Sequence, residues 1–279
     1  MAICCKKRFI ECKENEGSFM IPAERHKRII DIVDERRFIS LNEISESLNI
    51  PKSTLRRDVQ ELELGGHLIR SKGGVSLVGE DSTLHNVSHE ASVHIRKSKC
   101  QEEKARIARA AMKYVNPNDT IFLDSGTTTY ELARELSAYD QYLMVACNDL
   151  SSALEMSEND KLELVVIGGK LRKYNYSMIG YFSDSIISQM HADTAFISTD
   201  AVDGRKGLMA FSLDEVTGKK AMINGAHQVI LLCDHTKFSR IAFVTISELE
   251  KIDRLITGKE VDSTALRPFY ELGIEVDLV

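Results

Sequence analysis

The chain has 279 residues, 43% of them hydrophobic, and a formal net charge of −6, which allows one or two domains with sizeable cores. No apolar run approaches the ~18 residues that a membrane span needs, and charged residues interrupt the N-terminal stretch where a signal peptide would lie. We therefore expect a cytoplasmic protein with no membrane partner. A net-acidic chain has no general attraction to polyanions, so any contact with nucleic acid must be local.

The N-terminal segment is interpreted as an extension. Cys4, Cys5 and Cys12 could bind a metal, but none of the six cysteines has zinc-finger spacing, so free thiols on a disordered tail are favoured. We expect residues 1–21 to be this extension. Met20 directly precedes the first ordered-looking segment, which leaves open whether residues 1–19 belong to the native protein.

Residues 22–78 have the pattern of a small DNA-binding domain. Pro22 opens a first helix, and Ser40 with Glu43 has the spacing of a capping box before a second. Pro51 opens a third helix, and the stretch "HLIRSKGGVSLV" is typical of two short strands joined by a turn. Helix, helix, turn, helix and hairpin predict a mainly α domain with a β wing, a winged helix-turn-helix.

The third helix has an apolar back and a polar front. Leu55, Val59 and Leu62 share the inward face, whereas arginine, serine and glutamine point away from it. Such a front can enter the major groove of double-stranded DNA, although a solvated helix face is the simpler alternative. Asp58 lies nearer the buried edge and is expected to orient Thr54 or Arg57. The predicted DNA contacts are Lys52, Ser53, Thr54, Arg56, Arg57 and Gln60 on the helix, with Arg70 and Lys72 on the wing.

Residues 79–101 have little apolar periodicity and are expected to form a linker or linker helix. His85, His89 and His94 could be interpreted as a metal cluster, but their spacing is weak support. From residue 102 to 258, strand and helix patterns alternate, and the strands are almost continuously apolar. This predicts an α/β domain with a mostly parallel sheet covered on both faces, on which residues 259–279 pack.

Polar loops follow several of the predicted strands. "FLDSGTTTYEL" places Gly126 and two threonines at a helix N-terminus, where backbone N–H groups and the helix dipole favour an anion. The loop is neither a Walker loop nor a Rossmann fingerprint, and a capped helix without a ligand is the alternative. We expect a pocket for a phosphate and a polyol, with no metal or cofactor. Its predicted residues are Asp124, Ser125, Gly126, Thr127, Thr128, Asn148, Asp200, Glu215, Lys219 and Lys237.

Both halves resemble the DeoR family of bacterial transcription regulators. The segment "IPKSTLRRDV" is similar to the family's recognition helix, with Pro51 where serine usually stands. The second half matches at Glu102 to Ala108, the Asp-Ser-Gly-Thr-Thr loop, Asn148, Gly168–Gly169, Gly180, Asp200, Glu215, Lys219 and Asp234 to Phe238. The resemblance implies a sensor domain with the ribose-5-phosphate isomerase-like fold and a repressor of a carbohydrate operon that a phosphorylated sugar releases from operator DNA. It also implies that the Gly-Thr-Thr loop and Lys219 or Lys237 hold the phosphate.

Two other functions have to be weighed. The sensor fold is shared with sugar-phosphate isomerases, in which Asp200 or Glu215 could be offered as a base. The isomerases' Asp-Gly-Ala-Asp-Glu loop appears only as "STDAVDG", so no catalytic residue is expected. An activator cannot be separated from a repressor by sequence. A short recognition helix makes few contacts, so pairing of the chain with itself, as a dimer or tetramer, is expected.

Overall fold

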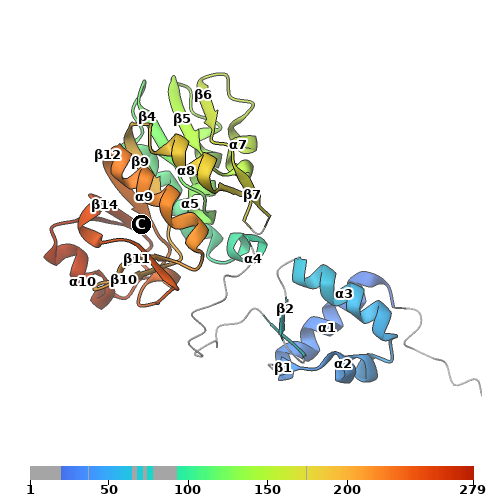
Figure 1. Ribbon diagram of the computed structural model, residues 1–279. Coiled ribbons are helices and arrows are strands. Elements are labelled where there is room, and N and C mark those ends of the chain that lie inside the picture. The colour runs from blue at the N-terminus through green and yellow to red at the C-terminus, as the bar shows by residue number, and fades with distance from the viewer. Residues whose placement is uncertain (1–19, 37, 65–67, 72–73, 78–92, 174) are drawn as a thin grey trace, which may run out of the picture. The chain divides into compact units, whose positions relative to one another are not determined.

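The computed structural model describes residues 20–36, 38–64, 68–71, 74–77, 93–173 and 175–279 (Figure 1). Its contacts divide the chain into two compact units, Met1–Ser82 and Thr83–Val279. The interpretations of the cysteines in the N-terminal extension, of His85 and His89, and of the side chain of His94 lie outside the described residues. Within the described residues, no helix is long and apolar enough to cross a membrane.

The first unit is the predicted winged helix-turn-helix. It contains α1 (Pro22–Arg36), β1 (Phe38–Ile39), α2 (Leu41–Leu48), α3 (Lys52–Leu64), β2 (Leu68–Ser71) and β3 (Gly74–Leu77). The strands form an antiparallel sheet in the order β1-β3-β2. Ser40 and Glu43 make both hydrogen bonds of the capping box, and Asn49 ends α2 in the left-handed conformation at φ 50°. These local devices fix the turn that leads into α3.

The second unit is built on a seven-stranded parallel sheet, as the alternating pattern predicts. The order is β15-β14-β12-β9-β4-β5-β6, and every pair is parallel. The strands are β4 (Thr120–Leu123), β5 (Leu143–Cys147), β6 (Leu162–Val166), β9 (Ala192–Ile197), β12 (Ala226–Leu232), β14 (Arg254–Thr257) and β15 (Glu275–Leu278). The last of these, together with α10 (Ser263–Glu271), comes from residues 259–279 and extends one edge of the sheet.

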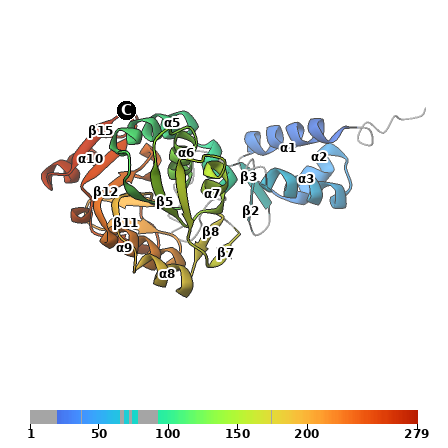
Figure 2. The same ribbon diagram turned by 90° about the horizontal axis from the view of Figure 1, so that it is seen from above.

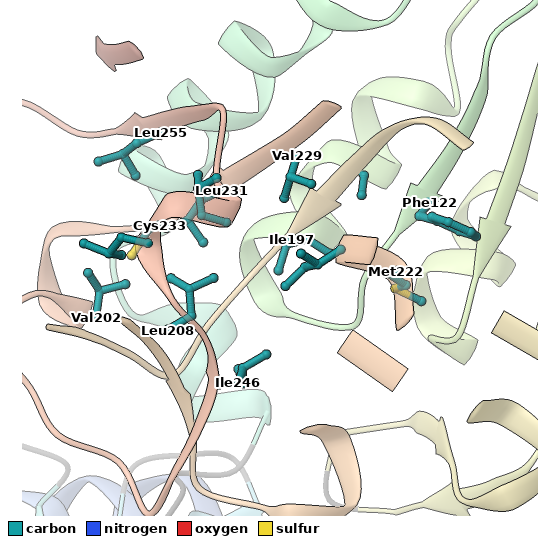
Figure 3. Packing of buried hydrophobic residues seen from close by; sticks show 14 of the residues in the cluster. Phe122, Ile197, Val202, Leu208, Met222, Val229, Leu231, Cys233, Ile246 and Leu255 are labelled. Carbon is teal, nitrogen blue, oxygen red and sulfur yellow. The ribbon is translucent and has the colours of Figure 1, made fainter. Parts of the chain in front are cut away.

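Helices cover both faces of this sheet (Figure 2). One face packs on α5 (Gln101–Ala111), α6 (Thr127–Leu136) and α7 (Leu150–Met156), and the other on α8 (Tyr181–Ile187), α9 (Val216–Gly225) and α10. Side chains alternate between the two cores along each strand. Phe122 enters the core beneath α8, α9 and α10, where it lies with Met222 and Ile197 (Figure 3). Its neighbours Ile121 and Leu123 enter the core beneath α5, α6 and α7.

Shorter elements complete the unit. α4 (Val93–Ser98) precedes α5, and the 3-10 turns are η2 (Met112–Tyr114), η3 (Leu213–Glu215), η4 (His235–Lys237) and η5 (Leu249–Lys251). An antiparallel sheet joins β10 (Ala201–Asp203), β11 (Gly207–Ala210) and β13 (Val244–Ser247), and a hairpin joins β7 (Lys170–Arg172) to β8 (Ser177–Ile179).

The strand order defines where a ligand is expected. From β4 the chain proceeds outward to β5 and β6, then returns to β9 on the other side of β4 and continues to β12, β14 and β15. The segments that follow β4 and β9 therefore start side by side, at the carboxyl ends of two adjacent strands. In open α/β sheets this change of direction is the usual position of a ligand crevice.

Candidate DNA-binding surface and effector pocket

The third helix of the first unit has the two faces that the sequence predicts. Leu55 and Val59 are fully buried and Leu62 is 3% exposed, so one side of α3 belongs to the core of the unit. Among the predicted DNA contacts on α3, Thr54 is half-buried. The other five are exposed, namely Lys52, Ser53, Arg56, Arg57 and Gln60. The exposed front offers two guanidinium groups, an ammonium group and short polar side chains on one helix surface.

The wing contributes Arg70, which is exposed on β2 with its Nε 3.7 Å from Glu63 Oε2. Lys72 lies outside the described residues. The expectation for Asp58 was wrong: its carboxylate accepts two hydrogen bonds from Arg25 of α1 and orients neither Thr54 nor Arg57. Asp58 is 1% exposed, and a buried carboxylate requires a charged partner, which α1 supplies.

A pocket in the second unit lies at the change of direction in the sheet. Its lining consists of Arg96, Ser125, Gly126, Thr127, Thr128, Ser198, Thr199, Asp200, Glu215, Lys219 and Lys237. The loop after β4 and the segment after β9 thus meet, as their strand positions require. Of the predicted effector residues, only Asp124 and Asn148 do not line the pocket. Asp124 is fully buried beneath it, and Asn148 donates to the carbonyl oxygen of Met178 at 3.4 Å.

Gly126 allows the two sides of the pocket to approach closely. A Cβ at this position would collide with the side chain of Ser198, so only glycine fits. Gly126 is the N-cap of α6 and supplies no side-chain cap to the N–H groups of the first turn, and Gly126, Thr127 and Thr128 all line the pocket. With the hydroxyl groups of Thr127 and Thr128, this helix end is suited to an anion.

Lys219 forms part of the pocket floor. Its ammonium group pairs with Asp124 and donates to the carbonyl oxygen of Ser198 at 3.1 Å. Burial on its own lowers the pKa of Lys219, but the negative charges of Asp124 and Glu215 outweigh it and raise that pKa above its ordinary value. Lys219 is therefore a charged residue that holds the two loops together.

The remaining charged groups of the pocket differ in how firmly they are held. Glu215 Oε1 accepts from Arg172 Nη1 at 2.8 Å and from Asn175 Nδ2 at 2.5 Å. Asp200 accepts from the backbone N–H of Phe211 at 3.1 Å. Lys237 is half-buried and forms no ion pair with any described residue, which distinguishes it from Lys219. Lys237 is thus the pocket cation best placed to accept a new anionic partner.

Arg96 was not among the predicted site residues. It belongs to α4, and its Nη1 lies 3.5 Å from Asp200 Oδ1 at the pocket wall. The local sequence carries no signal for this position, because residues 79–101 show little apolar periodicity and Asp200 is 104 residues away. Ser198 and Thr199, which directly follow β9, also line the pocket.

Comparisons with known proteins identify both units. Residues 25–80 match the model of the DeoR-like helix-turn-helix domain, and residues 99–259 match that of the DeoR C-terminal sensor domain. The chain belongs to the DeoR family. As a member of that family it is a DNA-binding transcriptional regulator and not an enzyme.

Relatives match along almost their whole length. An uncharacterized HTH-type transcriptional regulator of Haemophilus influenzae is 32% identical over 93% of this chain and 98% of its own. The glycerol-3-phosphate regulon repressor of Escherichia coli is 28% identical over 93% of this chain and 100% of its own. Among solved structures, ribose 5-phosphate isomerase A of Methanocaldococcus jannaschii overlaps 50% of this chain and 55% of its own, with 18% identity and a TM-score of 0.38.

Proposed function

We propose that this DeoR-family regulator represses an operon for carbohydrate use and that a phosphorylated sugar releases it from operator DNA. In this proposal residues 22–78 bind the operator, residues 79–101 are the linker, and residues 102–258 with the C-terminal segment 259–279 sense the effector. A regulator of chromosomal DNA acts where the DNA lies, so we place it in the cytoplasm.

The observation that carries the proposal is the composition of the pocket. An uncapped helix N-terminus at Gly126 and the ammonium group of Lys237 face the same small space. The carboxylates of Asp200 and Glu215 line it as well, and they can accept hydrogen bonds from hydroxyl groups. An anion-binding end beside hydroxyl-binding carboxylates matches a small polyol that carries one phosphate. A relative whose name is glycerol-3-phosphate regulon repressor agrees with this class of ligand.

The DNA-binding surface of the proposal is the exposed front of α3 with Arg70 on the wing. Arg56, Arg57 and Gln60 suit base edges in the major groove, whereas Lys52, Arg70 and the unplaced Lys72 suit phosphates. One recognition helix buries little surface, so we expect two chains to bind repeated half-sites. The effector can release DNA only by favouring a conformation with lower DNA affinity. A 100-fold release corresponds to about 2.7 kcal/mol of coupling.

The first experiment is a thermal-shift screen of sugar phosphates beside their unphosphorylated parents. A ligand well above its Kd raises the midpoint by mass action. We expect stabilisation only by a phosphorylated compound, and the same compound should dissociate the protein from its operator in a fluorescence-anisotropy assay. Stabilisation only by unphosphorylated sugars would refute the anion site. Transcription in vitro from the target promoter then decides repression against activation.

A matched pair of arginine variants tests the DNA-binding surface. Arg57→Ala should lose about 1–3 kcal/mol of operator affinity while it keeps effector binding. Arg205→Ala removes the same charge from an exposed loop of the sensor unit and should bind the operator like the unmodified chain. Equal operator affinity of both variants would show that Arg57 does not touch DNA.

A further inference from the structure

Four side chains able to bind a metal meet where α5 begins and β12 ends. Cys100 precedes α5, Glu103 lies in its first turn, and Asp234 with His235 follows β12. One ligand atom from each residue lies within 4.8 Å of the corresponding atoms of the other three. We propose that Cys100, Glu103, Asp234 and His235 form a Zn²⁺ site in the sensor unit.

The donor types favour zinc over the other common divalent cations. A thiolate, an imidazole nitrogen and two carboxylate oxygens give a mixed sulfur, nitrogen and oxygen set, and four protein ligands close a tetrahedral shell. Magnesium and calcium prefer oxygen donors alone and do not use thiolates. Zn²⁺ would displace the thiol proton of Cys100, so binding is coupled to proton release.

The two carboxylates are already oriented by hydrogen bonds. Glu103 Oε1 accepts from the backbone N–H of His235 at 2.7 Å, and Oε2 lies 2.7 Å from His235 Nδ1. Asp234 Oδ1 accepts from the backbone N–H of Thr236 at 3.0 Å and from its hydroxyl group at 2.5 Å. The bonds from the backbone of His235 and from Thr236 are outer hydrogen bonds, which are a regular part of metal sites, whereas the Glu103–His235 side-chain contact joins two of the proposed ligands.

The backbone holds Cys100 in an uncommon conformation. Cys100 has φ 55° and ψ 35°, in the left-handed region that residues with a Cβ rarely adopt. Lys104 stabilises this turn, because its buried ammonium group donates to the carbonyl oxygens of Arg96 and Lys99. The cysteine is thus directed at the cluster by a constrained turn between α4 and α5.

Charge and access are both compatible with a divalent cation. Glu103 is 4% exposed and Asp234 is 1% exposed, whereas Cys100 and His235 are half-buried and leave a route from solvent. With Cys100 deprotonated, the ligands carry three negative charges, and Lys104 and Lys237 are the cations whose charges act on Asp234. The three ligand charges exceed the two lysine charges by one, and a divalent cation would pair with these buried carboxylates directly.

The position of the site gives it a structural role next to the effector pocket. Asp234 and His235 begin the segment that ends at Lys237, and Cys100 follows the helix that carries Arg96. A bound ion would tie these two pocket-lining segments together. The sequence alone predicts no metal site here, because Glu103 and His235 are 132 residues apart and only the fold brings them together.

The test is a Zn²⁺ titration of the full chain under reducing conditions, in a background of Cys4→Ser, Cys5→Ser and Cys12→Ser. A chromogenic chelator measures the affinity and stoichiometry, and substitution with Co²⁺ reports the ligand geometry. We expect one tightly bound ion per chain, a thiolate-to-cobalt charge-transfer band and the intense visible bands of tetrahedral Co²⁺. Loss of an outer hydrogen bond weakens metal binding by about 10- to 100-fold. Cys100→Ala and His235→Gln each remove a ligand, so each should weaken Zn²⁺ binding by more than that.

Two matched controls remove the same residue types elsewhere in the unit. Cys147→Ala changes a buried cysteine of β5, and His227→Gln changes an exposed histidine of β12. Both variants should keep the bound ion. No stoichiometric Zn²⁺ in the background chain, or binding that neither Cys100→Ala nor His235→Gln weakens, would overturn the proposal. Because no sugar enters the assay, its result is independent of the effector proposed above.

Discussion

Arg25 of α1 and Asp58 of α3 form a two-pronged ion pair that joins the first and third helices of the DNA-binding unit. Arg25 Nε donates to Asp58 Oδ2 at 2.8 Å and Nη2 donates to Oδ1 at 2.8 Å. Asp58 immediately follows Arg56 and Arg57 of the exposed front and lies on the buried side of the same helix. The pair therefore fixes how α3 presents its arginines.

Removing Arg25 should destabilise the DNA-binding unit. Arg25→Met leaves the carboxylate of Asp58 buried without its main partner, which we expect to cost about 3 kcal/mol of the free energy of unfolding. Hydrogen exchange of α1 and α3 at increasing urea concentration measures this unit separately. Arg28→Met is the control, because Arg28 is exposed and, among the described residues, forms its ion pair only with Glu24 on the same helix. Equal protection in both variants would show that the Arg25–Asp58 pair adds nothing.

The same pair predicts an acid limit for the unit. Burial on its own raises the pKa of Asp58, but the hydrogen bonds and charge of Arg25 outweigh it and lower that pKa below its ordinary value of about 3.9. The unfolded chain therefore binds this proton first. The contribution of Asp58 to stability is complete above the unfolded pKa and is lost as the pH falls through the lower, folded one.

Asp58→Asn should flatten this pH dependence. The variant is less stable at neutral pH, but its free energy of unfolding should fall less steeply between about pH 5 and pH 2. Part of the pH dependence of stability should remain in Asp58→Asn, because hydrogen bonds from Ser40 also lower the pKa of Glu43. Urea unfolding followed by hydrogen exchange over this pH range measures both slopes. An unchanged slope in Asp58→Asn would contradict the assignment.

Local patterns in the sequence were enough to predict the recognition helix. The buried set Leu55, Val59 and Leu62 is spaced for one helix face, so the exposed set on the opposite face follows from the helical repeat alone. The partner of Asp58 could not be found in this way. Arg25 is 33 residues away, and only the packing of α1 on α3 brings the two charges together.

The pocket shows the same division. Ser125 to Thr128 were predicted because residues after a parallel strand reach one edge of the sheet, where the structure places them. Arg96 was missed because it enters from a helix that the sheet pattern does not include. Lys219 was expected to contact the ligand, yet its bond to the buried Asp124 depends on a fold-level contact between residues 95 positions apart.

Substitution of Gly126 should abolish effector binding without loss of DNA binding. In Gly126→Ala the new methyl group collides with Ser198, which forces the loop after β4 away from the segment after β9. The expected result is operator binding of normal affinity that the effector no longer reverses. Gly168→Ala is a matched control, because a Cβ at Gly168 meets nothing within 4 Å. Normal release of Gly126→Ala by the effector would show that this approach of the loops is not needed.

Lys237 should contribute more to effector affinity than to stability. Its ammonium group forms no ion pair with any described residue, so Lys237→Ala breaks no direct contact and removes only a positive charge that acts on the buried Asp234. A charge-assisted hydrogen bond to a phosphate is worth about 1.5–3 kcal/mol, and its loss should weaken effector binding by about 10- to 150-fold. Isothermal titration of the effector identified in the thermal-shift screen measures this loss, while the unliganded melting temperature stays within a few degrees.

Two other lysines serve as references for this prediction. Lys220 follows Lys219 on α9 but its side chain is exposed, and the Lys220→Ala variant should bind the effector normally. Lys219→Met should instead lower the unliganded melting temperature, because it leaves Asp124 buried without its ammonium partner. If Lys237→Ala kept full affinity, the phosphate contacts would have to come from the α6 N-terminus and Arg96, because Lys219 is already committed to Asp124.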